Sequence, residues 1–198
     1  MQPLSVLKSA IFTLLILTLG VSAQAATYYV AKSGNNSNSG SEAQPWLTVQ
    51  HAANQVQPGD TVSVKAGSYN ERVVLKNSGT AGGGYITFQN FPGDKPILDG
   101  TGLGNGMMVS SLNLSYIKIQ GFHIKNHIGG GIIFEGGGEF IEIRNNEISD
   151  QTHQGPQGHA ILVLGAYSWP YIYSARTNRN HRQQTIFTMS KLALIRLR

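Results

Sequence analysis

Three stretches in the middle of the chain share one pattern of hydrophobic and polar positions. Each begins with an aromatic residue, continues with alternating apolar and polar positions, and aligns with the other two without a gap over seven residues: 85–91, 116–122 and 140–146. Such alternation is typical of a β-strand that buries one face. We predict three equivalent strands that point isoleucine and phenylalanine side chains to a core, with Thr87, Lys118 and Glu142 in one outward column.

A second strand recurs inside the same units. Residues 131–136 match residues 160–165 as a short apolar run that ends in glycine. The three aligned segments begin 31 and then 24 residues apart. A unit of this length cannot bury its own apolar face, so it stacks on its neighbours in a solenoid. We therefore predict an all-β fold, a parallel β-helix over residues 58–165.

Two other repeat folds fit the pattern less well. A leucine-rich repeat needs a fixed Leu-x-x-Leu-x-Leu spacing, which this sequence lacks. A β-sandwich needs hairpin turns at shorter and more regular intervals than the variable loops found here.

Residues 26–57 are predicted to form the N-terminal end of the solenoid. A β-prone stretch at 28–31 precedes a loop rich in glycine, asparagine and serine at 32–41. In residues 45–56 the apolar positions recur at helical spacing, which predicts one short amphipathic helix. The helix is expected to end before Pro58-Gly59, a turn that cannot continue it.

The first residues, Met1 to Ala25, have the three parts of a signal peptide. Lys8 supplies positive charge, residues 10–23 are an apolar run, and Ala23-Gln24-Ala25 fits the small-x-small cleavage rule. The apolar run is shorter than the roughly 18 residues that a membrane-spanning helix needs. We expect cleavage after Ala25 and a secreted, extracellular or periplasmic protein that keeps no membrane anchor.

Charge is distributed unevenly along the chain. The formal net charge is +5 and the pI is near 9.5. Residues 27–165 hold eight Lys and Arg against all ten acidic residues, a balance of −2, whereas residues 166–198 hold six basic residues and no acid. The basic pI is therefore a property of the tail, and we expect no nucleic-acid partner for the coils.

The tail also differs from the coils in composition, because residues 166–198 contain none of the 24 glycines. We predict an aberrant basic tail that is unstructured or arises from a frameshift near codons 165–167, which leaves the solenoid truncated. The alternative is a natural basic tail that binds an anionic polymer or a membrane through its charge. An uncapped final coil would expose strand edges, so we expect a monomer or an aggregation-prone fragment.

The N-terminal motifs resemble a known family. The motifs are Tyr28-Tyr29-Val30-Ala31, Pro45-Trp46-Leu47-Thr48-Val49, and Pro58-Gly59-Asp60-Thr61-Val62 followed by Gly67 and Tyr69. They are similar to the N-terminus of secreted right-handed parallel β-helix proteins of the pectate lyase superfamily, especially the family-nine polysaccharide lyases. The resemblance covers about residues 28–165 and implies that the helix within 45–56 caps the solenoid. It also implies an acidic polysaccharide such as pectate as the ligand.

The resemblance further implies a reaction, β-elimination of polygalacturonate. In such lyases Ca²⁺ held by an aspartate cluster acidifies the sugar C–H, and a lysine removes the proton. The acidic residues of this chain are scattered and show no calcium-loop spacing, and no cysteine is present. We therefore assign no catalytic residue and no metal ligand, and expect the chain to be inactive as it stands. The alternative is a non-catalytic β-helix module that binds polysaccharide or lies at the cell surface.

Three residues remain as candidates for contact with a ligand. Asp150 opens a loop and is the acid best placed for a metal or sugar contact, and His153 and His159 flank a loop suited to sugar contact. His123 and His127 lie in an alternating segment and are interpreted as surface or loop histidines.

The pair formed by Glu142 and Lys118 is interpreted structurally. The two residues occupy equivalent outward positions of consecutive predicted strands. We expect a cross-strand ion pair there, not a catalytic group.

Overall fold

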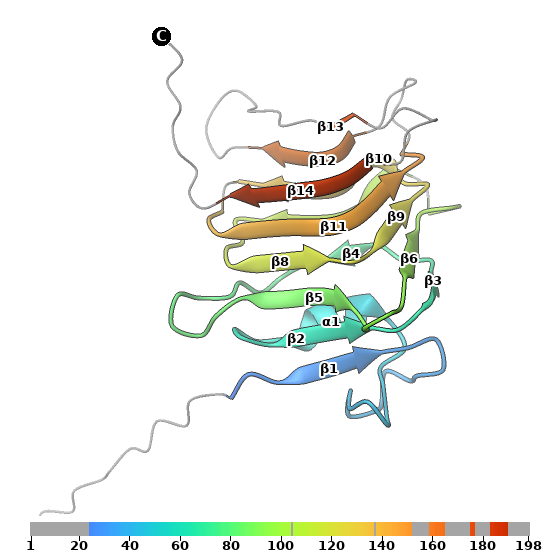
Figure 1. Ribbon diagram of the computed structural model, residues 1–198, viewed down its shortest axis with the longest axis vertical. Coiled ribbons are helices and arrows are strands. Elements are labelled where there is room, and N and C mark those ends of the chain that lie inside the picture. The colour runs from blue at the N-terminus through green and yellow to red at the C-terminus, as the bar shows by residue number, and fades with distance from the viewer. Residues whose placement is uncertain are drawn as a thin grey trace, which may run out of the picture.

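The computed structural model describes residues 24–103, 105–136, 138–151, 159–164, 175–176 and 183–189. Almost all of this chain is strand, stacked coil upon coil along one axis (Figure 1). The predicted all-β parallel solenoid is therefore confirmed. The predicted signal peptide lies outside the described residues except for residues 24 and 25. No described helix is long and apolar enough to cross a membrane.

The described elements are, in chain order, β1 (Thr27–Val30), α1 (Val49–Gln55), β2 (Thr61–Val64), β3 (Gly67–Tyr69), β4 (Val73–Val74), β5 (Ile86–Asn90), β6 (Pro96–Asp99), β7 (Asn105–Leu112), β8 (Ile117–Gln120), β9 (His123–Lys125), β10 (Ile128–Glu135), β11 (Ile141–Ser149), β12 (His159–Leu164), β13 (Ala175–Arg176) and β14 (Gln183–Met189).

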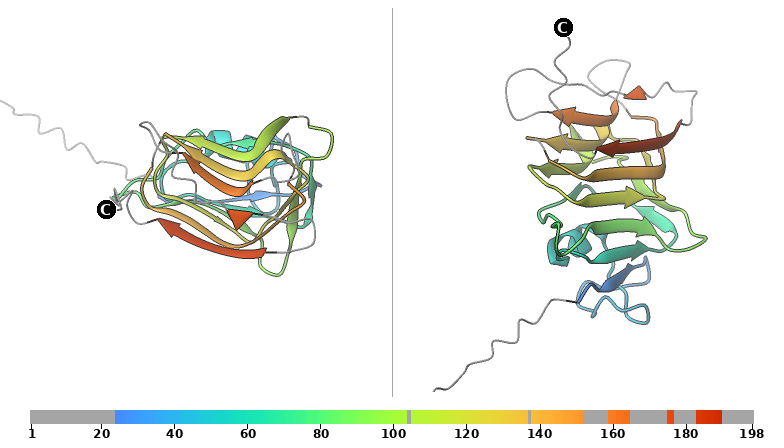
Figure 2. Two further views of the ribbon diagram at one scale, coloured as in Figure 1. Left: turned by 90° about the horizontal axis from the view of Figure 1, so that it is seen from above. Right: turned by 60° about the vertical axis from the view of Figure 1, so that its left-hand side comes forward.

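Two sheets wrap around the core (Figure 2). The first follows the order β1-β2-β5-β8-β11-β9-β6-β3, and the second follows the order β13-β12-β10-β7-β4. Strand β11 belongs to two faces, because its first half pairs with β8 and its second half with β9. The first sheet therefore bends at β11, and each half presents its own outer surface.

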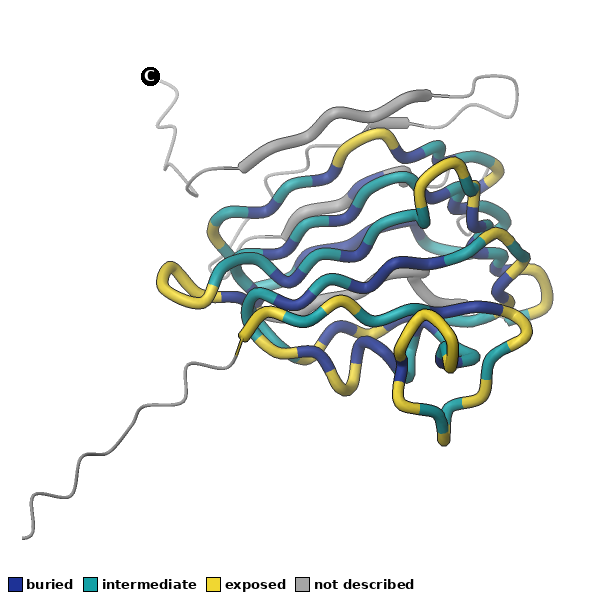
Figure 3. Tube along the Cα trace, turned by 60° about the horizontal axis from the view of Figure 1, so that its bottom comes forward, coloured by how far each residue is buried: buried dark blue, intermediate teal, exposed yellow. Residues whose placement is uncertain are grey.

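Strand register confirms the predicted repeat. The inward side chains of β5, β8 and β11 form two columns, and the buried and partly exposed positions alternate along the stacked strands (Figure 3). All six inward residues are at most 4% exposed: Ile86, Ile117 and Ile141 in one column, and Phe88, Ile119 and Ile143 in the other. Burial of each such side chain stabilises the fold by about 1.5–3 kcal/mol, and a single coil could not provide it.

Left-handed backbone conformations mark the corners of the coils. Gly121 and Asn145 occupy equivalent corners of consecutive coils with φ of 79° and 53°. Glycine and asparagine adopt this conformation at little cost, which explains their place at the corners. Tyr116 and Phe140, at another pair of equivalent positions, have φ of 55° and 58°. There an aromatic side chain is held in a conformation that costs about 1–2 kcal/mol.

Buried Asn146 ties two coils together at the corner within β11. Its Nδ2 donates to the backbone oxygen of Ile119 at 2.9 Å, and its Oδ1 accepts from the backbone nitrogen of Phe122 at 3.0 Å. The corner leaves these two backbone groups outside the strand ladder, and Asn146 has no exposed surface. Its amide thus satisfies polar groups that water cannot reach.

The predicted helix is confirmed as α1, which is shorter than the stretch of helical spacing at 45–56. Thr48 is its N-cap and accepts from the backbone nitrogen of His51. The carboxylate of Glu71 accepts from the backbone nitrogens of Val49 and Gln50, so two further donors of the first turn are satisfied. The buried side of α1 covers the N-terminal end of the core with Val49, Ala52 and Ala53.

The N-terminal edges of both sheets are covered. Loop residues pair with β1, since Tyr29 N donates to Gly40 O and Trp46 N donates to Tyr29 O. The Gln50 side chain forms two hydrogen bonds with the backbone of Val74, at the edge of β4. These contacts use strand groups that would otherwise be open to edge-to-edge association.

The C-terminal end contains two strands that the composition did not predict. Residues 175–176 and 183–189 lie in the segment expected to be unstructured, and they form β13 and β14. Strand β14 pairs antiparallel with β11, and β13 pairs antiparallel with β12. The expectation of an uncapped coil is therefore wrong for these two edges. The frameshift origin of the tail stays a prediction.

Replacement of Asn146 tests whether the corner amide holds the coils together. We expect Asn146→Ala to lower the free energy of unfolding by about 2–5 kcal/mol, because two buried backbone groups lose their partners. Urea unfolding measures the change. The neighbouring exposed Asn145 provides the control, since Asn145→Gly suits its left-handed backbone and should change stability by less than about 1 kcal/mol. Equal losses for the two variants would contradict this role of Asn146.

Candidate functional site

The outer face of β5, β8 and the first half of β11 carries three columns of side chains in register. We call this surface the platform. Its first column is aromatic, its second holds the predicted Thr87, Lys118 and Glu142, and its third holds two amides and an arginine. The aromatic column is Tyr85, Tyr116 and Phe140, and the third column is Gln89, Gln120 and Arg144.

The platform carries more positive than negative charge. Glu142 Oε2 lies 3.2 Å from Lys118 Nζ and 3.1 Å from Arg144 Nη2, so two cations share one carboxylate. The predicted pair of Lys118 and Glu142 is confirmed, whereas the contribution of Arg144 was not predicted. The Glu142 side chain is 14% exposed and that of Arg144 is 45% exposed. The surplus cation is therefore accessible to an anionic ligand.

The aromatic column forms one border of the platform. Tyr116 and Phe140 stack with ring centroids 4.4 Å apart, and Tyr85 meets Tyr116 edge to face at 5.7 Å. Lys118 Nζ lies 4.9 Å from the Tyr85 ring centroid. Burial raises the pKa of the Tyr85 hydroxyl, and the charge of Glu142 acts in the same direction. Ring stacking thus offsets part of the backbone strain at Tyr116 and Phe140.

The amide column forms the other side. Gln120 Nε2 donates to Gln89 Oε1 at 3.0 Å, which fixes the orientation of both side chains. An amide supplies both donors and acceptors. The platform therefore combines an accessible guanidinium, an ammonium and two ordered amides, a set that can bind carboxylate and hydroxyl groups.

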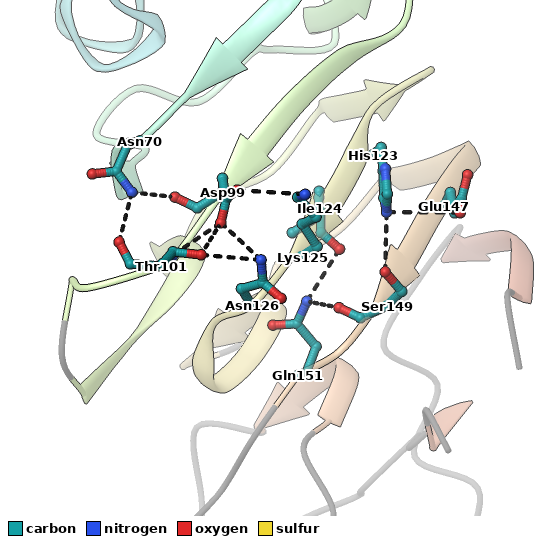
Figure 4. A network of polar contacts seen from close by, with 10 residues as sticks. All are labelled: Asn70, Asp99, Thr101, His123, Ile124, Lys125, Asn126, Glu147, Ser149 and Gln151. Carbon is teal, nitrogen blue, oxygen red and sulfur yellow. Dashed lines mark hydrogen bonds and ion pairs between the residues drawn. The ribbon is translucent and has the colours of Figure 1, made fainter. Parts of the chain in front are cut away.

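A second polar surface lies beyond the bend, on β6, β9 and the second half of β11 (Figure 4). We call it the polar strip. Asp99 accepts from the backbone and hydroxyl of Thr101 at 3.0 and 2.6 Å and from Asn126 Nδ2 at 3.0 Å. Lys125 Nζ lies 3.5 Å from its other oxygen.

These contacts set the charge of Asp99. Burial acts to raise the pKa of the Asp99 carboxyl, but the hydrogen bonds from Thr101 and Asn126, aided by Lys125, outweigh burial and lower the pKa to about 2. Asp99 is thus ionised at neutral pH, and its charge is matched by Lys125.

Serine, histidine and glutamate meet on the polar strip without forming a catalytic relay. His123 Nε2 lies 3.0 Å from Ser149 Oγ and 3.7 Å from Glu147 Oε1. A relay needs the serine and the carboxylate on opposite ring nitrogens, whereas both of these contacts involve Nε2. Glu147 is also paired with Lys95 at 2.5 Å.

Charge balance separates the two surfaces. On the polar strip Lys125 faces Asp99 and Lys95 faces Glu147, one cation to one carboxylate. On the platform two cations face one carboxylate. An acidic ligand gains most where a cation is incompletely neutralised and still accessible. The platform is therefore the candidate site.

The three candidate residues are not brought together by the described structure. Asp150 follows β11 at the end of the polar strip, where it is exposed and has φ of 56°. His153 lies outside the described residues. The backbone of His159 begins β12 and pairs with Gly130, and its side chain lies outside the described part of the chain.

The interpretation of His127 as a surface or loop histidine is wrong. His127 is 1% exposed, and its backbone nitrogen donates to the side chain of Gln151 at 3.1 Å. Its ring lies against Gly100, where an added Cβ would come within 2.3 Å of Nδ1. Gly100 belongs to the preceding coil, and it is the sequence signal that a buried ring fills this corner.

The aspartate cluster implied for calcium does not occur in the described residues. They contain no group of three or more histidine, aspartate or glutamate side chains that could hold a metal ion. Asp99, the acid with the densest polar contacts shown in Figure 4, is surrounded by donors from Thr101, Asn126 and Lys125. This environment does not suit a cation, and we derive no step through calcium.

Comparison with known proteins identifies the family. The family described as Pel9A-like, right handed beta helix region, matches residues 28–179, and the chain belongs to this family. The match confirms the predicted right-handed β-helix and extends past residue 165 into the basic tail. A Bacillus subtilis (strain 168) protein, the uncharacterized protein YwoF, is 28% identical over 143 residues. This chain spans 67% of its own length and 30% of that relative in the alignment.

Solved structures support the same fold. A rhamnogalacturonan lyase matches with a TM-score of 0.59 and 18% identity, over 70% of this chain and 38% of that chain. A GH136 lacto-N-biosidase from Eubacterium ramulus matches with a TM-score of 0.57 and 20% identity, over 70% of this chain and 30% of that chain. These similarities show a shared β-helix, and this chain covers a minor part of each neighbour.

Buried His127 predicts a loss of stability in acid. Burial lowers the pKa of His127 from 6.5 to about 4. Above pH 6.5 both the folded and the unfolded chain hold a neutral ring. As the pH falls from 6.5 toward 4, only the unfolded chain takes up the proton, so the free energy of unfolding drops by about 3 kcal/mol in total.

Urea unfolding at several pH values between 7 and 4 measures this loss. The His127→Gln variant has no ring to protonate, and we expect it to lose about 3 kcal/mol less than the parent over the same range. An identical pH dependence in the two proteins would show that His127 is not the responsible group.

Proposed function

We propose that this member of the Pel9A-like right-handed β-helix family binds an acidic polysaccharide through the platform on β5, β8 and β11. The observation that carries the proposal is the two-to-one charge arrangement of Lys118 and Arg144 around Glu142. The family relates the chain to polysaccharide-associated β-helix proteins, and the charge of the platform selects an acidic polymer among them.

The geometry gives each group a role in binding. The Arg144 guanidinium is planar and can hold a sugar carboxylate with two parallel hydrogen bonds. Lys118 lies on the same carboxylate and adds positive charge beside it. Gln120 pairs with Arg144 in the strand register and can bind sugar hydroxyl groups next to the carboxylate.

The solenoid also gives the ligand a direction. Equivalent positions repeat from strand to strand at about 4.7–4.9 Å. A polysaccharide is a linear repeat, so a chain that lies along the solenoid axis meets Gln89, Gln120 and Arg144 in turn. The aromatic column runs parallel to this path and borders it on the other side.

The proposal includes export of the protein. Lys8, the apolar run at 10–23 and Ala23-Gln24-Ala25 are its support. Plant and microbial acidic polysaccharides are extracellular polymers, so export would bring the platform to its ligand. We assign a binding role to the described coils and no β-elimination step.

Replacement of Arg144 tests the platform. We expect Arg144→Gln to weaken binding of polygalacturonate about tenfold, which corresponds to about 1.4 kcal/mol, because an accessible charge-assisted contact is lost. Isothermal titration calorimetry measures the affinity, and added salt should weaken the parent protein more than the variant.

Two lysine variants serve as matched controls. Lys125→Gln removes a cation of the polar strip that is already paired with Asp99, and Lys76→Gln removes an exposed cation beyond β4. Both should bind polygalacturonate within about twofold of the parent. Equal weakening in all three variants would indicate nonspecific charge attraction and contradict the platform. Release of unsaturated product with calcium present would contradict a role limited to binding.

A further inference from the structure

A buried carboxylate begins the first coil. Asp60 is 4% exposed. Its Oδ1 accepts from the backbone nitrogen of Ala26 at 2.9 Å, and its Oδ2 accepts from the backbone nitrogen of Gln57 at 2.7 Å. The backbone of Asp60 is also fixed, since its nitrogen donates to Gln57 O and its oxygen accepts from Thr87 N. The carboxylate is therefore held in one place by three segments of chain.

No cation among the described residues neutralises Asp60. The ion pairs of the described chain involve Glu42, Asp99, Glu142 and Glu147 as their acidic partners. Burial of an ionised carboxylate is costly unless an opposite charge or several hydrogen bonds accompany it. Two backbone donors meet part of this requirement. A positive charge next to Oδ1 would meet the rest.

Ala26 is the residue that supplies such a charge when the chain is processed. The small-x-small rule places cleavage between Ala25 and Ala26. Hydrolysis of that peptide bond by a signal peptidase consumes one water, leaves a carboxylate on Ala25 and creates an α-ammonium on Ala26. The nitrogen of that ammonium is the atom that already lies 2.9 Å from Asp60 Oδ1.

We propose that cleavage after Ala25 turns the hydrogen bond between Ala26 and Asp60 into a buried ion pair that locks the first coil. Ala26 is well placed for this role, because its oxygen accepts from Thr61 N at 2.8 Å at the start of the pairing of β1 with β2. The inference rests on the export proposed above, which supplies the cleavage. The ion pair itself is a property of the folded coil and can be measured in protein made without a leader.

The ion pair has a defined pH dependence. The Asp60 carboxylate favours the charged ammonium, so the pKa of the Ala26 amine is raised above the ordinary α-amino range of about 7.7–8.0. The added stability is fully present below that range and is lost as the pH rises through the raised pKa. Stability in the uncleaved chain, which has an amide at this position, lacks this dependence.

A double-mutant cycle tests the proposal. One protein begins at Ala26 and a second begins at Gln24, each released from a fusion by a protease that leaves no extra residue, and each is also made with Asp60→Asn. We expect the Ala26 protein to have an unfolding equilibrium constant about tenfold smaller than that of the Gln24 protein at neutral pH, which is about 1.4 kcal/mol. With Asp60→Asn the two lengths should be equally stable.

The amine pKa provides a second measurement that needs no substitution of Asp60. Titration of the Ala26 amine by nuclear magnetic resonance should give a pKa above that of the Gln24 amine in the longer protein. Equal stability of the two lengths, a difference that survives Asp60→Asn, or equal amine pKa values would each overturn the ion pair. N-terminal sequencing of exported protein that begins at another residue would overturn its link to cleavage and would leave binding of polysaccharide unaffected.

Discussion

The structure depends on the in-register stacking of short strands. No coil buries its isoleucines alone, and each inward column exists only because Ile117 lies between Ile86 and Ile141. This stacking supplies the apolar core and also determines the outer surface. Every outward residue is fixed opposite its equivalents in the coils above and below, so surface chemistry accumulates in columns. The platform is one result of this constraint, since Arg144 and Lys118 reach the same carboxylate through strand register.

The ends and corners solve the problems that stacking creates. Corners leave backbone groups outside the ladder, and Asn146 and Gln151 satisfy several of them from buried positions. Open sheet edges invite association, and the loop after β1, the Gln50 side chain and the antiparallel strands β13 and β14 pair with edge strands. Asp60 joins the N-terminal end to the first coil in the same manner. The stability of the core and the presentation of the platform therefore rest on a small set of polar contacts.

The sequence predicted what depends on local alternation and missed what depends on contacts between coils. The inward columns and the pair of Lys118 with Glu142 follow from aligned strands, and both are confirmed. Arg144 was missed because its contact with Glu142 joins two residues of one strand outside the predicted column. His127 was misread because its burial depends on Gly100 in another coil. Antiparallel β14 was missed because the composition of the tail carries no signal of the strand beside which it lies.

The central claim is that incomplete neutralisation of two cations makes the platform a site for an acidic polysaccharide. A crystal structure of the protein with a short oligogalacturonate tests it most directly. We expect the sugar chain on the outer face of β5, β8 and β11, with a carboxylate within hydrogen-bonding distance of the Arg144 guanidinium. A sugar chain bound instead on the polar strip or on the outer face of the second sheet would contradict the claim.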